Sequence, residues 1–156
     1  MTRRLALLAL PLLLGGCSLM ASSGPTTLVQ TGTAAVNGVQ ETVLTDAQGQ
    51  TLYIDTADGP LSPSCVGPCT QVWPPLLSPS GRAVSAPGLG GMLTVTDDAN
   101  GAQVQYNGHF LYLYSGDSAP GQANGQNIGG LLVATPNLPQ LSPISMGPTF
   151  NPSPSY

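Results

Sequence analysis

Three kinds of residue in this sequence could carry chemistry: one histidine, three cysteines and a tyrosine-rich segment that ends in an aspartate. A catalytic serine–histidine–aspartate set would have to use His109, which directly follows the Asn107-Gly108 dipeptide. A histidine beside a tight turn, with no evident acid partner, is more often an exposed turn residue. The sequence contains no Gly-x-Ser-x-Gly elbow and no phosphate-binding loop. We therefore expect no enzymatic activity, no cofactor and no metal site.

The tyrosine-rich segment, residues 106–117, begins with a strong hairpin signal. Asn107-Gly108 favours a two-residue turn, because both central residues of a type I′ turn need positive φ. The aromatic and leucine residues that follow favour a strand. Pairing across the turn would align Tyr106 with His109, Val104 with Leu111, and Ala102 with Leu113. Leucine side chains would then line one face of the hairpin and aromatic rings the other.

The aromatic face of this hairpin consists of Phe110, Tyr112 and Tyr114. These rings could stack against a planar or extended partner. The alternative, which we favour, is that they are buried under the first half of the chain. Asp117 follows in a Ser-Gly-Asp turn, where a carboxylate can accept hydrogen bonds from backbone N–H groups.

The same pattern occurs earlier in the chain, because residues 49–58 align with residues 108–117. Both read Gly-x-x-Leu-Tyr, an aliphatic residue, three variable residues and an aspartate. We interpret this as an internal duplication of a hairpin unit, with Tyr53 and Tyr112 in equivalent environments. The positions expected to be buried are Leu52, Ile54, Val104, Leu111 and Leu113.

Composition favours an all-β domain with many turns. The chain of 156 residues contains 20 glycines and 16 prolines, and no stretch after the N-terminus has helical periodicity. We predict a small domain over residues 37–136, built from two related hairpin units with a disulfide-pinned loop between them. The chain has no lysine and only three arginines, so we expect no nucleic-acid binding, which requires neutralisation of phosphates by basic side chains.

The N-terminus resembles a bacterial lipoprotein signal. Arg3 and Arg4 precede an apolar stretch over residues 5–14, and Gly15-Gly16-Cys17 follows. The resemblance implies removal of residues 1–16 and lipidation of Cys17, which would anchor the protein stably through several acyl chains. The alternative is an ordinary secretory signal with an incidental cysteine.

Ser18 stands where lipoproteins that are retained in the inner membrane have an aspartate. Its presence therefore favours the outer membrane in a cell with two membranes. Otherwise the outer face of the cell membrane is expected. Residues 17–36 are rich in Ser, Thr, Gly and Ala, and they predict a flexible tether after the lipidated cysteine. Residues 137–156, rich in Pro and Ser, predict a disordered tail.

Cys65 and Cys69 have the spacing Cys-x-x-x-Cys. In an exported protein a disulfide is the default interpretation, and it would pin a proline-rich loop. Metal binding is the rival, although two thiolates and one histidine do not complete a tetrahedral zinc site. Redox catalysis is a further alternative, although its usual signature is Cys-x-x-Cys. We expect Trp73, the only tryptophan, to pack over this loop, with ligand stacking as the alternative.

Four features together resemble a known family: the N-terminal signal, the cysteine pair followed by Trp73-Pro74-Pro75, the duplicated unit, and the Tyr112-to-Asp117 motif. The family is that of predicted bacterial lipoproteins with a Tyr-x-aromatic-x-x-Asp motif, also described as a secreted repeat of unknown function. The resemblance covers residues 41–136. Asp55 stands where the first motif should have an aromatic residue, and Leu131 stands where the family often has tryptophan.

We therefore expect a non-enzymatic binding or structural module of the cell envelope. Its partners would be the membrane, through the lipid, and either an envelope protein or a small planar ligand. The alternative is a redox, metal-handling or haem-handling envelope protein that uses Asp117, His109 and the tyrosine-rich strand. The residues expected to form the motif or a binding site are Tyr53, Asp58, Trp73, His109, Phe110, Tyr112, Tyr114 and Asp117.

Overall fold

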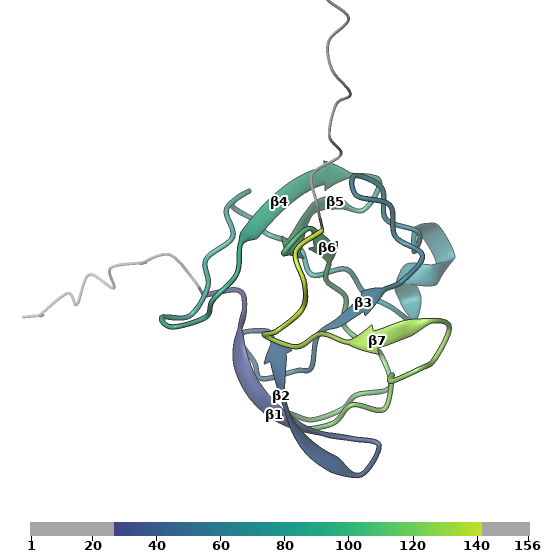
Figure 1. Cartoon of the computed structure of the whole chain (residues 1–156). Helices are drawn as coiled ribbons and strands as arrows, with labels where there is room; N and C mark the ends of the chain where they lie inside the picture. Colours follow the sequence, from purple (N-terminus) through teal and green to yellow (C-terminus); the bar gives the residue numbers. More distant parts are fainter. Residues whose placement is uncertain (1–26, 142–156) are drawn as a thin grey trace, which may run out of the picture.

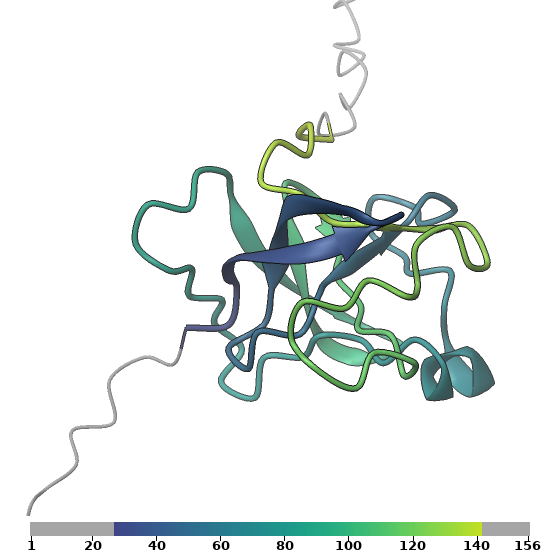
Figure 2. The ribbon, with the colours of Figure 1, turned by 90° about the horizontal axis from the view of Figure 1, so that it is seen from below.

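The computed structural model describes residues 27–141, and in this part of the chain the predicted all-β fold is confirmed. The only helical element there is a short 3-10 helix, which lies at the periphery of the molecule (Figure 2). The elements are β1 (Gln30–Val36), β2 (Val39–Thr45), β3 (Tyr53–Asp55), η1 (Gly67–Gln71), β4 (Leu93–Asp98), β5 (Gly101–Tyr106), β6 (His109–Phe110) and β7 (Leu131–Val133).

The strands form three small antiparallel sheets, β1-β2, β3-β7 and β4-β5-β6 (Figure 1). Two of the hairpins turn at an Asn-Gly pair. Asn107 and Gly108 have φ values of 53° and 86°, and Asn37 and Gly38 have 50° and 83°. Positive φ at both positions is what a type I′ turn requires, so the predicted turn at Asn107 is confirmed. The turn at Asn37 obeys the same rule, but the sequence-based prediction missed it.

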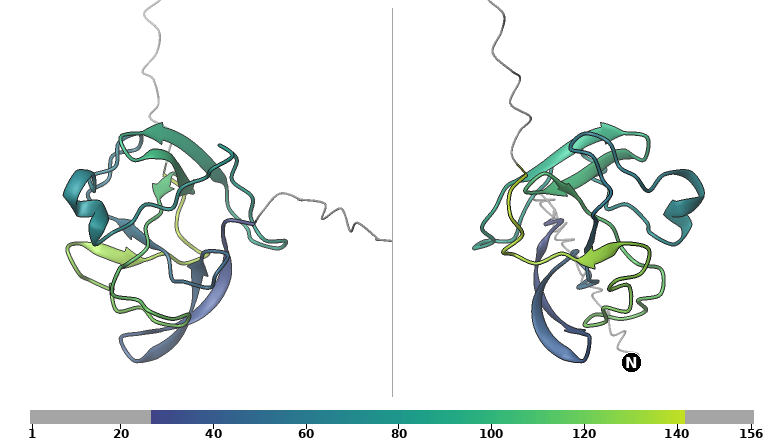
Figure 3. Two further views of the ribbon diagram at one scale, coloured as in Figure 1. Left: turned by 180° about the vertical axis from the view of Figure 1, so that it is seen from behind. Right: turned by 45° about the vertical axis from the view of Figure 1, so that its right-hand side comes forward.

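The two copies of the repeated motif meet in the middle of the molecule, between the β1-β2 hairpin and the three-stranded sheet (Figure 3). Tyr53 and Tyr112 form an antiparallel bridge, with Tyr53 N donating to Tyr112 O at 2.8 Å and Tyr112 N donating to Tyr53 O at 2.9 Å. Because each tyrosine bonds its counterpart through both backbone groups, the motif strands are related by an approximate two-fold axis at this bridge.

In the first half, the chain around Leu52 closes a triangle of backbone hydrogen bonds. Leu52 N donates to Leu44 O at 2.9 Å, and Leu44 N donates to Ala134 O at 2.8 Å. Ala134 N completes the triangle by donating to Leu52 O at 2.8 Å. The third corner therefore comes from the segment around β7, far along the chain from the other two.

The second half contains the same triangle around Leu111. Leu111 N donates to Val104 O at 3.0 Å, Val104 N to Leu76 O at 2.8 Å, and Leu76 N to Leu111 O at 2.9 Å. The third corner here comes from the segment of residues 74–77, which follows the first motif in sequence. Each half is thus completed by a segment of the other, and neither half alone contains all of its own backbone hydrogen-bond partners.

The core has two apolar clusters, one on each side of the motif strands. The aromatic cluster includes Tyr53, Trp73, Phe110 and Tyr112, with Tyr114 packed against it. The aliphatic cluster lies on the opposite side, where the leucines of both motifs point. Its buried members are Val29, Leu44, Leu52, Ile54, Leu76, Val104, Tyr106, Leu111 and Ala134. This separation follows from the period of two along a strand, and it confirms the expected division of leucines from aromatic rings. Leu113 differs from the expectation, since it is only half-buried.

The predicted pairing of Ala102 with Leu113 is wrong. The hairpin pairing runs from Tyr106 with His109 as far as Val104 with Leu111. At that point Leu76 lies between the two strands, where Val104 N donates to Leu76 O and Leu76 N donates to Leu111 O. Beyond this point Leu113 N donates to Pro74 O at 2.7 Å, while Ala102 O accepts from Ser78 N. The physical reason is the inserted segment, which separates the two strands after the first few pairs.

The expected tether over residues 17–36 is wrong in its last part, because Gln30–Val36 is strand β1. Its residues pair with β2 over the full strand, from Gln30 opposite Thr45 to Val36 opposite Val39. Side chains along the strand alternate between the core and the solvent, so Ala34 and Val36 are buried while Ala35 is exposed. The small side chains gave the segment the composition of a linker, although they fit against the core.

The expected disordered tail is wrong for residues 137–141. The Asn107 side chain donates to Leu138 O at 2.7 Å, and Leu141 N donates to Asn107 O at 2.9 Å. These bonds hold the segment after β7 against the central hairpin. The predicted signal peptide (residues 1–16), the lipidated Cys17, the rest of the tether, and residues 142–156 of the tail lie outside the described residues.

Candidate functional site

The repeated motif forms two reciprocal side-chain contacts between the halves. The Tyr53 hydroxyl donates to Oδ2 of Asp117 at 2.5 Å, and the Tyr112 hydroxyl donates to Oδ1 of Asp58 at 3.1 Å. Each tyrosine therefore bonds the aspartate of the other repeat, not the aspartate five residues further along its own. We call these four residues the Tyr–Asp lock. The expected equivalence of the two tyrosines is confirmed, since both are fully buried and make the same kind of bond.

Each aspartate of the lock also holds the loop that follows its own motif. Oδ1 of Asp58 accepts the backbone N–H of Ser64 at 2.7 Å, and Oδ1 of Asp117 accepts that of Asn124 at 2.9 Å. A short carboxylate in a turn is suited to this role, as the sequence indicated. The lock thus links the motif strand of one half to the following loop of the other.

Burial raises the pKa of both lock tyrosines and of Asp58. It is the largest influence raising the pKa of both tyrosines, and the hydrogen-bonded carboxylates of Asp117 and Asp58 raise these pKa values further, so both hydroxyls stay protonated at neutral pH. Burial also raises the pKa of Asp58, and it outweighs the hydrogen bonds from Ser64 and Tyr112 that favour the charged carboxylate. One oxygen of that carboxylate, Oδ2, is buried and has no hydrogen-bond partner among residues 27–141.

The aromatic rings near the lock lie against one another. Trp73 and Tyr114 are tilted by 36° with ring centroids 4.5 Å apart, and Tyr53 meets Trp73 edge to face at 5.3 Å. Gly125 fits beneath these rings, because a Cβ atom at this position would lie 2.7 Å from Trp73 Cη2. Trp73 is only 4% exposed and packs with Cys65 and Cys69, so its expected place over the disulfide loop is confirmed.

The two halves differ at the position that Tyr114 occupies. The register of β3 with β7 places Asp55 opposite Leu131, and the corresponding residues of the other half are Tyr114 and Trp73. An aromatic pair in one half therefore replaces an acid and a leucine in the other. Asp55 accepts a hydrogen bond from the Ser64 hydroxyl at 2.5 Å, so it anchors a loop and has no ring to offer a ligand.

A cleft with a volume of about 250 Å³ opens beside Tyr114. Its walls are formed by residues from both halves, namely Gln50, Thr51, Pro74, Leu113, Tyr114 and Asp117. Sequence analysis singled out Tyr114 and Asp117 but missed the other four. The duplication could have indicated Gln50 and Thr51, because they follow Gly49 as His109 and Phe110 follow Gly108.

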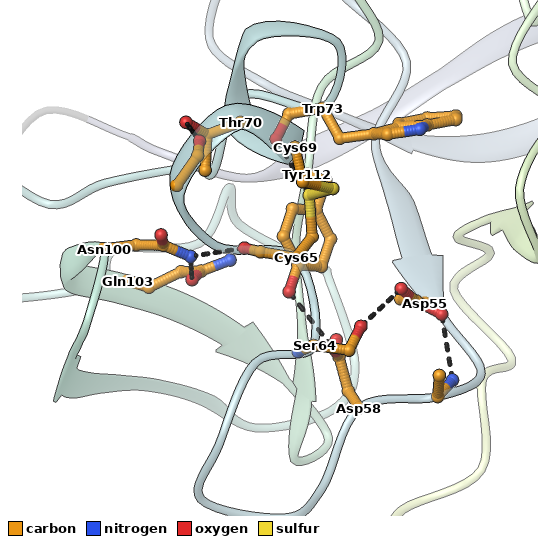
Figure 4. Close-up of a disulfide and its surroundings, with 12 residues drawn as sticks. Asp55, Asp58, Ser64, Cys65, Cys69, Thr70, Trp73, Asn100, Gln103 and Tyr112 are labelled. Carbon is orange, nitrogen blue, oxygen red and sulfur yellow. Dashed lines mark hydrogen bonds between the residues drawn. A yellow bond between two sulfur atoms is a disulfide. The ribbon is translucent and has the colours of Figure 1, made fainter.

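The predicted bridge between Cys65 and Cys69 is confirmed, with the two Cα atoms 5.3 Å apart. Figure 4 shows the bridge beside the buried end of the lock, where the Tyr112 hydroxyl points to Asp58. Asn100 reaches in from the β4-β5 turn and donates through Nδ2 to Cys65 O at 2.9 Å (Figure 4). The disulfide therefore fixes the start of the segment that carries Trp73 and continues to Leu76.

The remaining predicted site residues serve other contacts. Phe110 and Tyr112 are fully buried, so Tyr114 is the one ring of the expected aromatic face that is partly exposed. His109 is half-buried, and its Nε2 donates to Pro139 O at 3.0 Å. Within residues 27–141, the structure brings together no group of three or more His, Cys, Asp or Glu side chains suited to a metal ion.

Comparison with known proteins matches the chain to one family model, described as a secreted repeat of unknown function. The match falls on residues 34–77 and again on residues 93–131, together more than half of the chain. Each matched stretch contains one copy of the Gly-x-x-Leu-Tyr motif with its aspartate. No curated protein and no solved structure matches the chain. No helix formed by residues 27–141 has the length and apolar character needed to cross a bilayer.

Removing either lock hydroxyl should lower the free energy of unfolding. Tyr53→Phe and Tyr112→Phe each remove a hydrogen bond from a buried tyrosine to a half-buried carboxylate, so each should cost about 1–3 kcal/mol, measured by chemical denaturation. Tyr114→Phe is the matched control, with an expected change within about 0.5 kcal/mol. A double-mutant cycle should couple Tyr53→Phe with Asp117→Ala, which removes the acceptor, but not with Asp58→Ala. Coupling to Asp58 instead would contradict the reciprocal arrangement.

The raised pKa of Asp58 predicts a pH dependence of stability. A carboxyl whose pKa is raised by folding stabilises the protein below about pH 4, the unfolded value, and this contribution is lost as the pH rises through the folded pKa. Asp58→Asn keeps an acceptor for Tyr112 and cannot titrate. The unfolding free energy of the wild type minus that of Asp58→Asn should therefore fall from acidic to neutral pH. A difference that is constant, or that rises with pH, would contradict a raised pKa.

Proposed function

The chain belongs to the family of secreted repeats of unknown function, and from this membership we propose that it is a non-enzymatic binding module held on the cell envelope by a lipid. A secreted family implies an envelope or extracellular location. The lipid is supported by the order of the N-terminal features, in which two arginines, an apolar stretch and two glycines precede Cys17.

The observation that carries this proposal is the contrast between the lock and Tyr114. The hydroxyls of Tyr53 and Tyr112 and the carboxylates of both motif aspartates are engaged with one another. Such groups stabilise a scaffold, because each hydroxyl is already occupied as a donor and each carboxylate already accepts from a tyrosine of the other half. Tyr114 belongs to the same motif but is only half-buried, and it faces a cleft shared by both halves. A rigid scaffold with one accessible ring suits recognition.

A redox or metal-handling function, the alternative, has less support. It would need His109 and Asp117 to act with the tyrosine-rich strand. His109 is held by Pro139, and Asp117 is bonded to Tyr53 and Asn124. The two side chains thus serve contacts to different parts of the chain, and we propose a binding module on this ground.

The lipid anchor predicts a simple change in fractionation. Cys17→Ser removes the thiol that would be acylated, so the protein should lose incorporation of radiolabelled palmitate and move from the membrane pellet to the soluble fraction. Ser18→Ala, next to the modified residue, is the control and should remain in the pellet. Unchanged pelleting of Cys17→Ser would mean that something other than this lipid holds the protein.

Binding through the cleft can be tested in intact cells by photo-cross-linking. Benzoylphenylalanine at position 50 would lie in the wall of the cleft, and the same residue at position 109 would occupy the equivalent place in the other half. We expect a specific adduct with an envelope component from position 50 and only background from position 109. Background at both positions, or equal adducts from both, would count against a binding function at this cleft.

A further inference from the structure

The cleft beside Tyr114 depends on residues that differ between the two halves of the duplication. The equivalent of Thr51 in the other half is Phe110, which is fully buried, and the equivalent of Tyr114 is Asp55. A threonine in place of a phenylalanine leaves space, and a tyrosine in place of an aspartate supplies an apolar wall for it. Both differences fall in the same cleft, so the two halves diverge where a ligand could enter.

The size of the cleft limits its occupant. Sites for small molecules and cofactors usually have volumes of about 300–1,000 Å³ and enclose most of the ligand. A volume of about 250 Å³ lies below that range. It is sufficient for a single long side chain that reaches in from a partner on the surface. The occupant is therefore better described as one residue of a protein segment than as a whole metabolite.

The walls select the chemistry of that side chain. Pro74, Leu113 and the ring of Tyr114 offer apolar surface, which suits a methylene stem and the flat face of a guanidinium group. Two polar groups at the walls can accept hydrogen bonds from that side chain, the Asp117 carboxylate and the Gln50 amide oxygen. Asp117 uses one lone pair of each carboxylate oxygen for Tyr53 and Asn124, which leaves further lone pairs for a donor.

Gln50 adds a second acceptor. Its Oε1 atom is buried and has no hydrogen-bond partner among residues 27–141. An acceptor left in this state destabilises the protein until a donor reaches it. The overall charge acts in the same direction, because the chain has seven acidic side chains and Arg82 is the only arginine or lysine among the described residues.

We propose that the cleft formed by Gln50, Thr51, Pro74, Leu113, Tyr114 and Asp117 binds a basic side chain, arginine above all, from an extended segment of a partner protein. The guanidinium group lies on the Tyr114 ring and donates to the Asp117 carboxylate and to Gln50 Oε1. Arginine is preferred over lysine because its planar fork can stack and donate to two acceptors together. This inference rests on the proposed binding function and specifies its ligand.

The test is a titration of the protein from Ser18 onward with three acetylated and amidated tripeptides, Ala-Arg-Ala, Ala-Lys-Ala and Ala-norleucine-Ala. Binding is followed by Trp73 fluorescence, which should respond because Trp73 stacks on Tyr114, and by amide chemical shifts of residues 50, 51, 113 and 114. The arginine peptide should bind at least about tenfold more tightly than the norleucine peptide, because one charge-assisted hydrogen bond contributes about that factor. Added salt should reduce this preference.

Variants separate the cleft from the lock. Asp117→Asn should abolish the preference for arginine, whereas Asp58→Asn, which changes the matching lock residue outside the cleft, should retain it. If Asp117→Asn fails to fold, Gln50→Lys provides the test. Gln50 is half-buried, and a lysine there should repel the ligand without touching the lock.

Equal binding of the arginine and norleucine peptides, or chemical-shift changes away from the cleft, would overturn the proposal that the cleft binds a basic side chain. Agmatine binding as tightly as the arginine peptide would overturn a protein partner in favour of a free organic cation. These failures remain distinct from a failure of the binding module itself, which is judged by cross-linking from position 50.

Discussion

The structure depends on the exchange of partners between the two halves. Tyr53 is bonded to Asp117 and Tyr112 to Asp58, and the same two tyrosines bond each other through their backbones. All four backbone and side-chain bonds span more than fifty residues of chain, so none can form before the halves meet. Loop-closure entropy opposes such contacts, and it is offset only when many of them form together. The two repeats therefore behave as one cooperative unit.

This dependence allows the halves to diverge without loss of the fold. The lock and the backbone triangles keep both motif strands in place, so a position outside them can change. Two pairs that differ between the aligned stretches are Thr51 with Phe110 and Asp55 with Tyr114. One half thereby packs its side with a buried phenylalanine, and the other opens a cleft. A duplicated fold can in this way fill a position with a buried side chain in one copy and leave it open in the other.

Much of this arrangement is visible in the sequence, and its limits have physical causes. The duplication, the Asn107-Gly108 turn and the disulfide each leave a local signal, and the structure confirms them. The exchange of partners leaves none, because Tyr53 would meet the same residue type in Asp58 as in Asp117. Residues 74–77 were also invisible as a strand-like segment, since two prolines usually mark a turn or an edge. They fit here because the carbonyl of Pro74 accepts a hydrogen bond from Leu113 N, and a proline, which has no N–H, needs no acceptor.

The loops that follow the two motifs are held in place by different kinds of interaction in the two halves. Each loop must return the chain from a lock aspartate to the segment that completes the opposite half. In the first half the bridge between Cys65 and Cys69 holds the loop covalently. In the second, Gln126 Oε1 accepts Val133 N at 2.7 Å and Gln122 Oε1 accepts Ser118 N at 2.6 Å.

Hydrogen bonds to glutamine side chains open at a lower free energy than a covalent bridge does, so the second loop is the one that can adjust. That loop also lies next to the cleft. Its Gln122 carbonyl accepts the Thr51 hydroxyl at 2.5 Å, and its Gly125 lies against Trp73 and Tyr114. The loop held by glutamine hydrogen bonds therefore borders the diverged cleft.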